Sequence, residues 1–248
     1  LLNKNKETCI FINSCDKTHD VARYFIKSFH KFIKNDYLDV FIGVNKKVHD
    51  KEYSFLNYIY APKSNWKIET TLQLDELKNK YGYQNVIHIL DDFIFCDYSD
   101  LDDLIEIIKL FKQKKIKYLC LKKVKECFAV NILSSIRSKD KISKIRENYP
   151  YYTSLQISLW DIEYFKKNIE CCKSIWNFER LQLLKNHYNV SKDLFHYNHV
   201  VEKGEWNYGT LRYIEKYVSH FNPGNRQFRK SFLGSQIFYL QKISFFIF

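Results

Sequence analysis

The chain has 248 residues, 46% of them hydrophobic and 17% aromatic, which is enough apolar material for one large domain with a buried core and excludes a globally disordered protein. Its 40 Lys and Arg against 28 Asp and Glu give a formal net charge of +12, which suits a nucleic acid, an anionic membrane surface or simply a solvated basic face. No run reaches the roughly 18 apolar residues of a membrane-spanning helix, so the sequence predicts no span.

The first half of the chain alternates short apolar runs with amphipathic stretches. The run TCIFIN at 8–13 predicts a buried strand, and apolar residues from Val21 to Ile33 recur at helical spacing. The same patterns predict helices at 67–80 and 101–111 and strands at 38–44, 55–60, 86–90 and 116–121. This alternation predicts an α/β fold with a largely parallel sheet covered by helices on both faces.

The second half is less regular, and its patterns predict strands at 128–133, 155–159 and 194–201 and helices at 161–169, 178–185 and 206–218. We expect one continuous domain over 1–225. The tail, 226–248, mixes Arg229, Lys230 and Lys242 with Phe, Leu and Ile residues. It predicts either a helix packed on the core or a helix that lies on a membrane surface.

Two polar turns follow predicted strands: Ser14-Cys15-Asp16 and the pair Asp91-Asp92. Because parallel sheets bind ligands outside the carboxyl ends of their strands, we expect both turns to face one cleft. Two carboxylates there suit Mg²⁺ or Mn²⁺ held against a diphosphate, and Asp16 suits a base or ribose. The alternative is that these acids only cap turns and helices.

The segment 151–179, YYTSLQISLWDIEYFKKNIECCKSIWNFE, is the most informative. Gln156, Trp160 and Trp176 lie among its apolar residues, and exposed aromatic faces suit sugar rings. Glu179 follows Trp176 and Phe178, and a carboxylate beside aromatic rings is a candidate general base. Its alternative role is that of an ordinary acid at a helix N-terminus.

Two histidines, His196 and His199, raise the question of a metal site. Side chains three residues apart in a strand point to opposite faces. We therefore do not expect these two histidines to bind a metal together.

Several motifs together resemble bacterial glycosyltransferases of capsule, O-antigen and lipooligosaccharide clusters, which have a GT-A-like core. The resemblance extends over roughly residues 8–206. The motifs, in chain order, are Ser14-Cys15-Asp16, Trp66 in the loop PKSNW, Asp91-Asp92-Phe93, Ser154-Leu155-Gln156 with Trp160, the run SIWNFE ending at Glu179, and Lys203-Gly204-Glu205-Trp206.

The resemblance implies a GT-A-like three-layer sandwich and a hexosyltransferase-like enzyme. The enzyme would move a sugar from a nucleotide-sugar donor to a surface polysaccharide or lipid-linked saccharide. Phe93 takes the place of the last Asp in a strict Asp-x-Asp motif, which puts metal dependence in question. The implied residues are Glu179 for catalysis; Ser14, Cys15, Asp16, Trp66, Asp91 and Asp92 for the donor; Gln156, Trp160, Trp176 and Phe178 for the acceptor; and Asp91 and Asp92 for a divalent cation, Mn or Mg.

Glu179 is the single candidate base, and a single base suffices for a displacement that inverts the anomeric carbon, so we expect inversion. Two other classes fit parts of the sequence. A basic nucleic-acid-binding protein or metal-dependent nuclease fits the charge, the aromatic residues and the acidic pair, but the sequence shows no helix-turn-helix, zinc-finger or RNA-binding aromatic motif. A non-catalytic carbohydrate-binding protein would not need Asp92 or Glu179. We favour the transferase and expect no nucleic-acid partner.

Seven cysteines, an odd number without a CxxC pair, indicate free thiols in a reducing cytosol and no structural zinc. The N-terminus opens polar and shows no signal peptide. We expect a cytoplasmic protein, with the basic, apolar tail favouring peripheral association with the anionic inner membrane.

Overall fold

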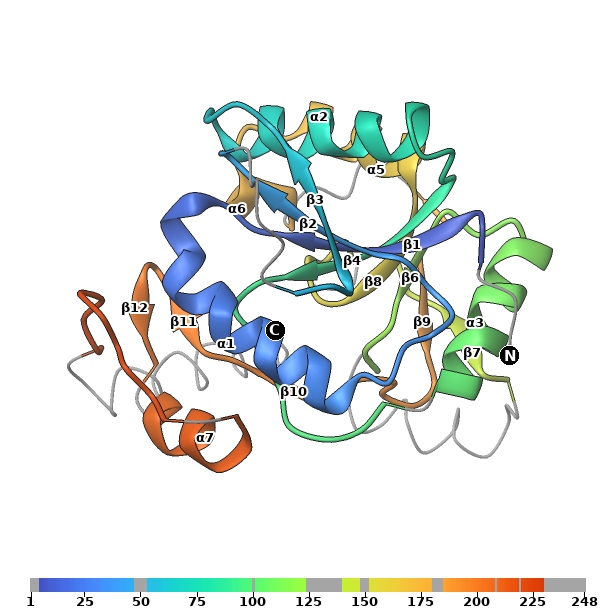
Figure 1. The fold of residues 1–248 in the computed structure, drawn as a ribbon. Helices are drawn as coiled ribbons and strands as arrows, with labels where there is room; N and C mark the ends of the chain where they lie inside the picture. The colour runs from blue at the N-terminus through green and yellow to red at the C-terminus, as the bar shows by residue number, and fades with distance from the viewer. Residues whose placement is uncertain are drawn as a thin grey trace.

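The computed structural model describes residues 5–46, 53–99, 101–123, 140–147, 152–179, 185–207, 209–218 and 220–229. At its centre lies an eight-stranded sheet in the order β3-β2-β1-β4-β8-β6-β9-β7 (Figure 1). Its strands are β1 (Thr8–Asn13), β2 (Val40–Val44), β3 (Leu56–Tyr60), β4 (Asn85–Leu90), β6 (Tyr118–Cys120), β7 (Ile142–Lys144), β8 (Ser158–Asp161) and β9 (Tyr188–Val190).

Most neighbouring strands run parallel, and β8 is the main exception. β3, β2, β1 and β4 form consecutive parallel pairs, and β9 lies parallel to β6. β8 is antiparallel to both β4 and β6, which makes β4 and β6 parallel to each other. β7 closes the edge antiparallel to β9.

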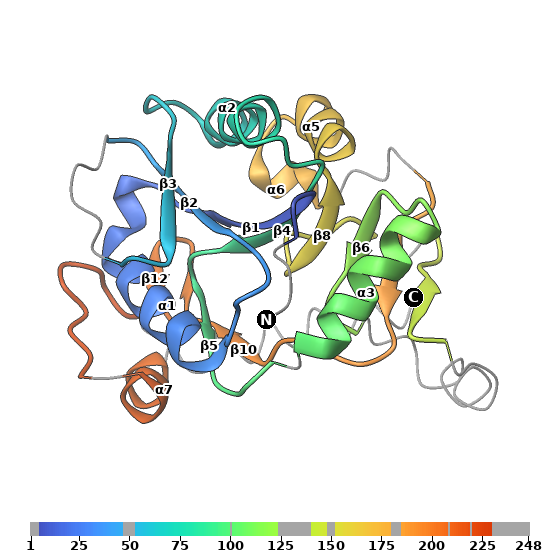
Figure 2. The same cartoon turned by 45° about the vertical axis from the view of Figure 1, so that its right-hand side comes forward.

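The sheet is buried on both faces because successive strand side chains point to opposite sides. In β1, Ile10 and Ile12 enter one apolar cluster, while Cys9 and Phe11 enter the other. Figures 1 and 2 show two helical layers, with α1 (His19–Phe32) and α3 (Leu101–Gln113) on one face and α2 (Trp66–Asn79), α5 (Ile162–Cys171) and α6 (Ile175–Phe178) on the other. The expected three-layer fold with a largely parallel mixed sheet is confirmed.

Smaller elements extend the edge of the sheet where the parallel strands end. A short 3-10 helix, η1 (Asp16–Thr18), connects β1 to α1. The chain after β4 forms β5 (Phe93–Phe95), which pairs antiparallel with β10 (Tyr197–His199). A hairpin of β11 (Val201–Glu202) and β12 (Glu205–Trp206) follows, and then α7 (Thr210–Tyr217).

The predicted elements of the first half are confirmed within about two residues. In the second half, the strand expected at 194–201 is divided into β10 and β11, and the helix expected at 206–218 begins only at Thr210 because Trp206 belongs to a hairpin. The strand expected at 128–133, most of the helix expected at 178–185, and the tail beyond residue 229 lie outside the described residues. None of the helices described is long and apolar enough to cross a membrane.

Candidate functional site

The polar turns that follow the parallel strands gather at one edge of the sheet. β1, β2, β4 and β6 run in the same direction, so their carboxyl ends meet there. β8 runs the opposite way, and the loop before it, with Gln156, therefore reaches the same edge. Ser14, Asn45, Asp91 and Lys122 each follow one of these strands closely.

Asp91 joins the β1 turn to the end of β4. Asn13 and Leu90 are register partners, which places the next residues, Ser14 and Asp91, side by side. The Ser14 hydroxyl donates to Asp91 Oδ2 at 2.5 Å, and the Thr18 hydroxyl donates to the same oxygen. Burial, and then the neighbouring charge of Asp92, raises the pKa of Asp91 to about 7 although both hydroxyl bonds lower it. Asp91 is thus a buried group that fixes the turn.

The raised pKa of Asp91 makes the stability of the fold depend on pH. Between pH 3.8, which is the ordinary pKa of an Asp side chain, and about pH 7, Asp91 keeps a proton in the folded protein that it has released in the unfolded chain. The stability that Asp91 contributes is therefore complete below about pH 4 and is lost as the pH rises through about 7, with a slope of up to about 1.4 kcal/mol per pH unit.

Asp91→Asn should flatten this dependence, because an amide oxygen still accepts the two hydroxyl bonds but does not titrate. The measurement is urea unfolding of wild type and variant at pH 4.5, 6.0 and 7.5. Equal slopes in the two proteins would show that Asp91 does not titrate in this window.

Asp16 connects the β1 turn to the end of β2. Its Oδ1 accepts the backbone N–H of Asn45 at 3.1 Å, and its own N–H donates to Asn45 Oδ1 at 3.2 Å. The side chain of Asp16 is one-third exposed, with the exposed ammonium of Lys46 at 3.9 Å. Cys15 is the half-buried N-cap residue of η1. The turn expected to bind the donor is therefore held in one shape by two neighbouring strand ends.

Asp92 lies against His199, a partner that the sequence did not suggest. Pairing of β10 with β5 places His199 opposite Phe93, and its Nε2 comes within 2.6 Å of Asp92 Oδ2. The Asp92 side chain is 19% exposed, yet its Oδ1 is buried and has no hydrogen-bond partner among the described residues. A buried carboxylate oxygen without a donor is costly, so a ligand that satisfies it would be favoured.

The chemistry of this pair fits a divalent cation that is shared with a phosphate ligand. Within the described part of the chain, no group of three or more His, Cys, Asp or Glu side chains forms a complete metal cage. Mg²⁺ is commonly held by one or two carboxylates plus substrate phosphates, Mn²⁺ also prefers carboxylate oxygens, and an imidazole suits Zn²⁺ better than either. Asp92 and His199 supply such a partial donor set, whereas the Oδ2 of Asp91 is engaged by Ser14 and Thr18.

Gln156 is bound by Tyr197 of β10, the strand that also carries His199. The Tyr197 hydroxyl donates to Gln156 Oε1 at 2.6 Å, and the Tyr197 ring packs on Phe93 at 4.6 Å. The Lys122 ammonium lies 4.8 Å from the centre of the Tyr197 ring. Since Tyr197 and His199 share one face of β10, Gln156, Lys122 and Asp92 lie along one polar strip.

Glu179 ends α6 and holds the loop that leads into β8. Its Oε1 accepts the backbone N–H of Leu155 at 3.0 Å and the Ser154 hydroxyl at 3.4 Å. The side chain is half-buried. The structure thus fixes this carboxylate next to the same loop that carries Gln156.

The expectation that Trp160 and Phe178 bind an acceptor sugar is wrong. Both side chains are essentially unexposed and pack together at 5.9 Å in the apolar cluster under α2 and α5. Strand alternation turns Trp160 into the core, so it offers no ring face to a ligand. Trp66 packs edge-on against Phe178 at 5.7 Å, on the border of the same cluster, and the side chain of Trp176 lies outside the description.

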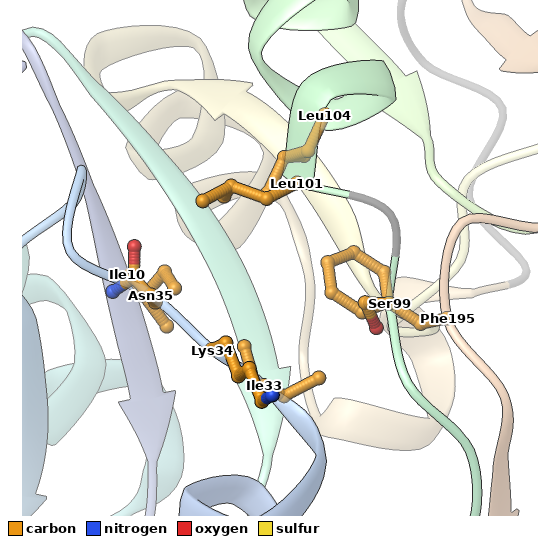
Figure 3. Close-up of a pocket in the computed structure, with 8 residues that line it drawn as sticks. All are labelled: Ile10, Ile33, Lys34, Asn35, Ser99, Leu101, Leu104 and Phe195. Carbon is orange, nitrogen blue, oxygen red and sulfur yellow. The ribbon is translucent and has the colours of Figure 1, made fainter. Parts of the chain in front are cut away.

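The described structure includes two hollows that differ greatly in size. One lies between β1, the end of α1 and the start of α3, and is drawn in Figure 3 with Ile10, Asn35 and Leu104 among its lining residues. Its volume of about 10 Å³ is at most that of one water, so it cannot hold a nucleotide. The other is an open groove of about 550 Å³ beside η1, lined in part by Lys17, Arg23 and Arg226.

No family model and no curated protein matches the sequence. Among solved structures, the chain is similar to Staphylococcus aureus TarS 1-349, with 11% identity, a TM-score of 0.46 and coverage of 76% of this chain and 59% of that one. The match to the same protein in complex with UDP-GlcNAc has 12% identity and a TM-score of 0.49, and it covers 81% of this chain and 60% of that one. The match to a cytidylyltransferase from Leptospira borgpetersenii has 9% identity and a TM-score of 0.40, and it covers 76% of this chain and 78% of that one. The chain thus spans about 60% of the length of the TarS fragment. Similarity at this level does not extend to function.

Proposed function

We propose that this chain is a glycosyltransferase that uses a nucleotide-sugar donor, with the donor's diphosphate at the carboxyl edge of the sheet. The observation that carries the proposal is the Asp92–His199 pair. It leaves the buried Oδ1 of Asp92 unsatisfied at the end of β4, directly beside the turn that follows β1. Nucleotide ligands bind outside the carboxyl ends of strands in open α/β sheets.

Each end of the donor would meet a different part of this edge. The one-third exposed carboxylate of Asp16, held by Asn45, suits the ribose or the base. Ser14, Thr18 and the buried Asp91 keep the turn in place beneath the diphosphate. Asp92 and His199 would hold a divalent cation, Mn²⁺ or Mg²⁺, which when bound supplies positive charge to the departing diphosphate.

The acceptor would approach from the side of Gln156 and Glu179. Glu179 takes the proton of an acceptor hydroxyl, whose oxygen bonds to the anomeric carbon as the bond to the nucleoside diphosphate breaks. One displacement of this kind inverts the configuration. The acceptor in this proposal is a growing surface polysaccharide or a lipid-linked saccharide, as in capsule or O-antigen synthesis, met at the cytoplasmic face of the inner membrane.

The test is thermal unfolding with UDP, GDP, CMP or dTDP, each with and without Mn²⁺. At about 100 times its Kd, the correct nucleotide should stabilise the fold by about 2.7 kcal/mol, which raises Tm by roughly 5–10 °C in a chain of this size. Asp92→Asn should lose this shift, because it removes the negative charge that faces the cation.

The matched control is Asp36→Asn, since Asp36 is an exposed acid that follows α1, far from the acidic pair in sequence. This variant should keep the full shift. If no nucleotide stabilises the wild type, or if Asp92→Asn responds as the wild type does, the donor site is not at this edge.

A further inference from the structure

The open groove beside η1 forms between parts of the chain that lie about 200 residues apart. One wall is Lys17, Asp20 and Arg23, from η1 and the first turns of α1. The other is the segment 220–229, which Figure 1 shows in red beside β12 and which contributes Asn222 and Arg226. Backbone bonds hold this segment in place, because Trp206 N–H donates to Gln227 O at 2.8 Å and Arg229 N–H donates to Trp206 O at 3.0 Å.

Arg226 fixes the relative position of the two walls. Its guanidinium makes a two-point ion pair with Asp20, with Nε–Oδ2 at 2.9 Å and Nη2–Oδ1 at 2.8 Å. It also donates to the carbonyls of Gly204 at 2.8 Å and Lys17 at 3.3 Å. Such bidentate geometry is rigid, so the groove is formed before any ligand arrives.

The groove retains positive charge after this pair is neutralised. Lys17 is exposed, and Arg23 donates to two neutral acceptors, the carbonyl of Asn222 at 2.7 Å and the hydroxyl of Tyr24 at 3.1 Å, whose ring lies 4.8 Å from the guanidinium. No acidic side chain in the described ranges forms an ion pair with Arg23. Among the described residues that line the groove, Asp20 is the one acidic side chain and none is aromatic. A hollow with ammonium, guanidinium and amide donors, without an aromatic platform, suits an oxyanion better than a neutral sugar ring.

The groove opens next to the acidic pair. Lys17 lies between Asp16 and Thr18, and the hydroxyl of Thr18 binds Asp91. The charge of Arg226 also reaches Asp91, whose pKa it lowers against the larger effect of burial. A ligand in the groove would thus lie beside a donor bound at the edge of the sheet.

We propose that this groove binds a phosphate group carried by the acceptor, with Lys17 and Arg23 as its main contacts. This inference rests on the proposed transferase function and adds the acceptor's chemical class: a saccharide linked to a phosphate ester. The reacting hydroxyl of the acceptor would still meet Glu179, so in this inference the acceptor extends from Glu179 past the donor to the groove.

The probe is glycerol 3-phosphate, titrated at low salt by calorimetry, with neutral glycerol as the comparison. Lys17→Gln should weaken binding at least about threefold and Arg23→Gln roughly tenfold, because each removes a charged donor. Added salt should weaken binding further, as expected for exposed charges. Lys27→Gln is the matched control, since Lys27 is an exposed cation on α1 that does not line the groove.

A second arm distinguishes a membrane lipid from a free phosphate ester. If Lys17→Gln lowers binding to phosphatidylglycerol vesicles and to glycerol 3-phosphate alike, the groove accepts phosphate from either source. Loss on vesicles alone would mean that the groove is a membrane contact, which would overturn the acceptor role. Displacement of glycerol 3-phosphate by UDP would also overturn the acceptor role, because the groove would then belong to the donor site.

The outcomes separate this inference from the proposed function. If UDP or another nucleotide stabilises the protein but Lys17→Gln and Arg23→Gln bind glycerol 3-phosphate as the wild type does, the groove assignment fails and the transferase stands. If the variants lose phosphate binding but no nucleotide binds, the groove is a phosphate site and its role in an acceptor site is wrong.

Discussion

Replacing Glu179 with Gln is expected to lower sugar transfer by on the order of 100-fold or more, because the variant loses the general base that takes the acceptor's proton. The fold should be kept, since an amide oxygen can still accept the hydrogen bonds from Leu155 N–H and the Ser154 hydroxyl. The measurement is kcat for donor consumption with acceptor present, together with Tm and the nucleotide-induced shift of Tm.

The control for this prediction is Glu170→Gln, which neutralises an exposed acid on α5 and should leave turnover unchanged. Near-normal turnover in Glu179→Gln would remove Glu179 from the role of base. A large fall in Tm would instead assign Glu179 a structural role as the anchor of the loop before β8.

Replacing Trp160 with Ala is expected to destabilise the fold by about 3–5 kcal/mol, the usual cost of deleting a buried large aromatic side chain. Trp160 is fully buried, its ring centre lies 4.2 Å from that of Tyr118 and 4.5 Å from that of Phe165, and its indole N–H donates to Ser158 Oγ at 2.9 Å. At roughly 2–4 °C per kcal/mol, Tm should fall by about 6–20 °C. Urea unfolding and thermal melts measure both quantities.

Two variants show whether burial is the cause. Trp160→Phe keeps most of the ring contacts and should lose clearly less stability, while Leu72→Ala, at a side chain that is 43% exposed on α2, should change little. A raised KM for acceptor with unchanged stability in Trp160→Ala would contradict the structure, because it would require an exposed Trp160.

Local pattern was sufficient for the elements that build the sheet. The run at 8–13 is apolar from Cys9 to Ile12, as expected for a strand covered on both faces, and the spacing from Val21 to Phe32 follows the buried side of α1. The meeting of the Ser14 turn with Asp91 was also predictable, since parallel neighbours end at the same edge. These features depend on residues close in the chain and on general rules of parallel sheets.

The partners within the site were decided by tertiary structure. Asp92 and His199 are 107 residues apart, and the contact depends on the pairing of β10 with β5, which no local periodicity indicates. Arg226 and Asp20 are 206 residues apart and form the groove in the same way.

The sequence by itself determined the α/β class, the order of its main elements and the polar edge, because periodicity and strand-end chemistry are local. Which aromatic side chains are exposed was settled only by packing. Trp160 and Phe178 are residue types that often bind sugars, but Trp160 on the antiparallel β8 and Phe178 on α6 both point inward, where burial of apolar area stabilises the core.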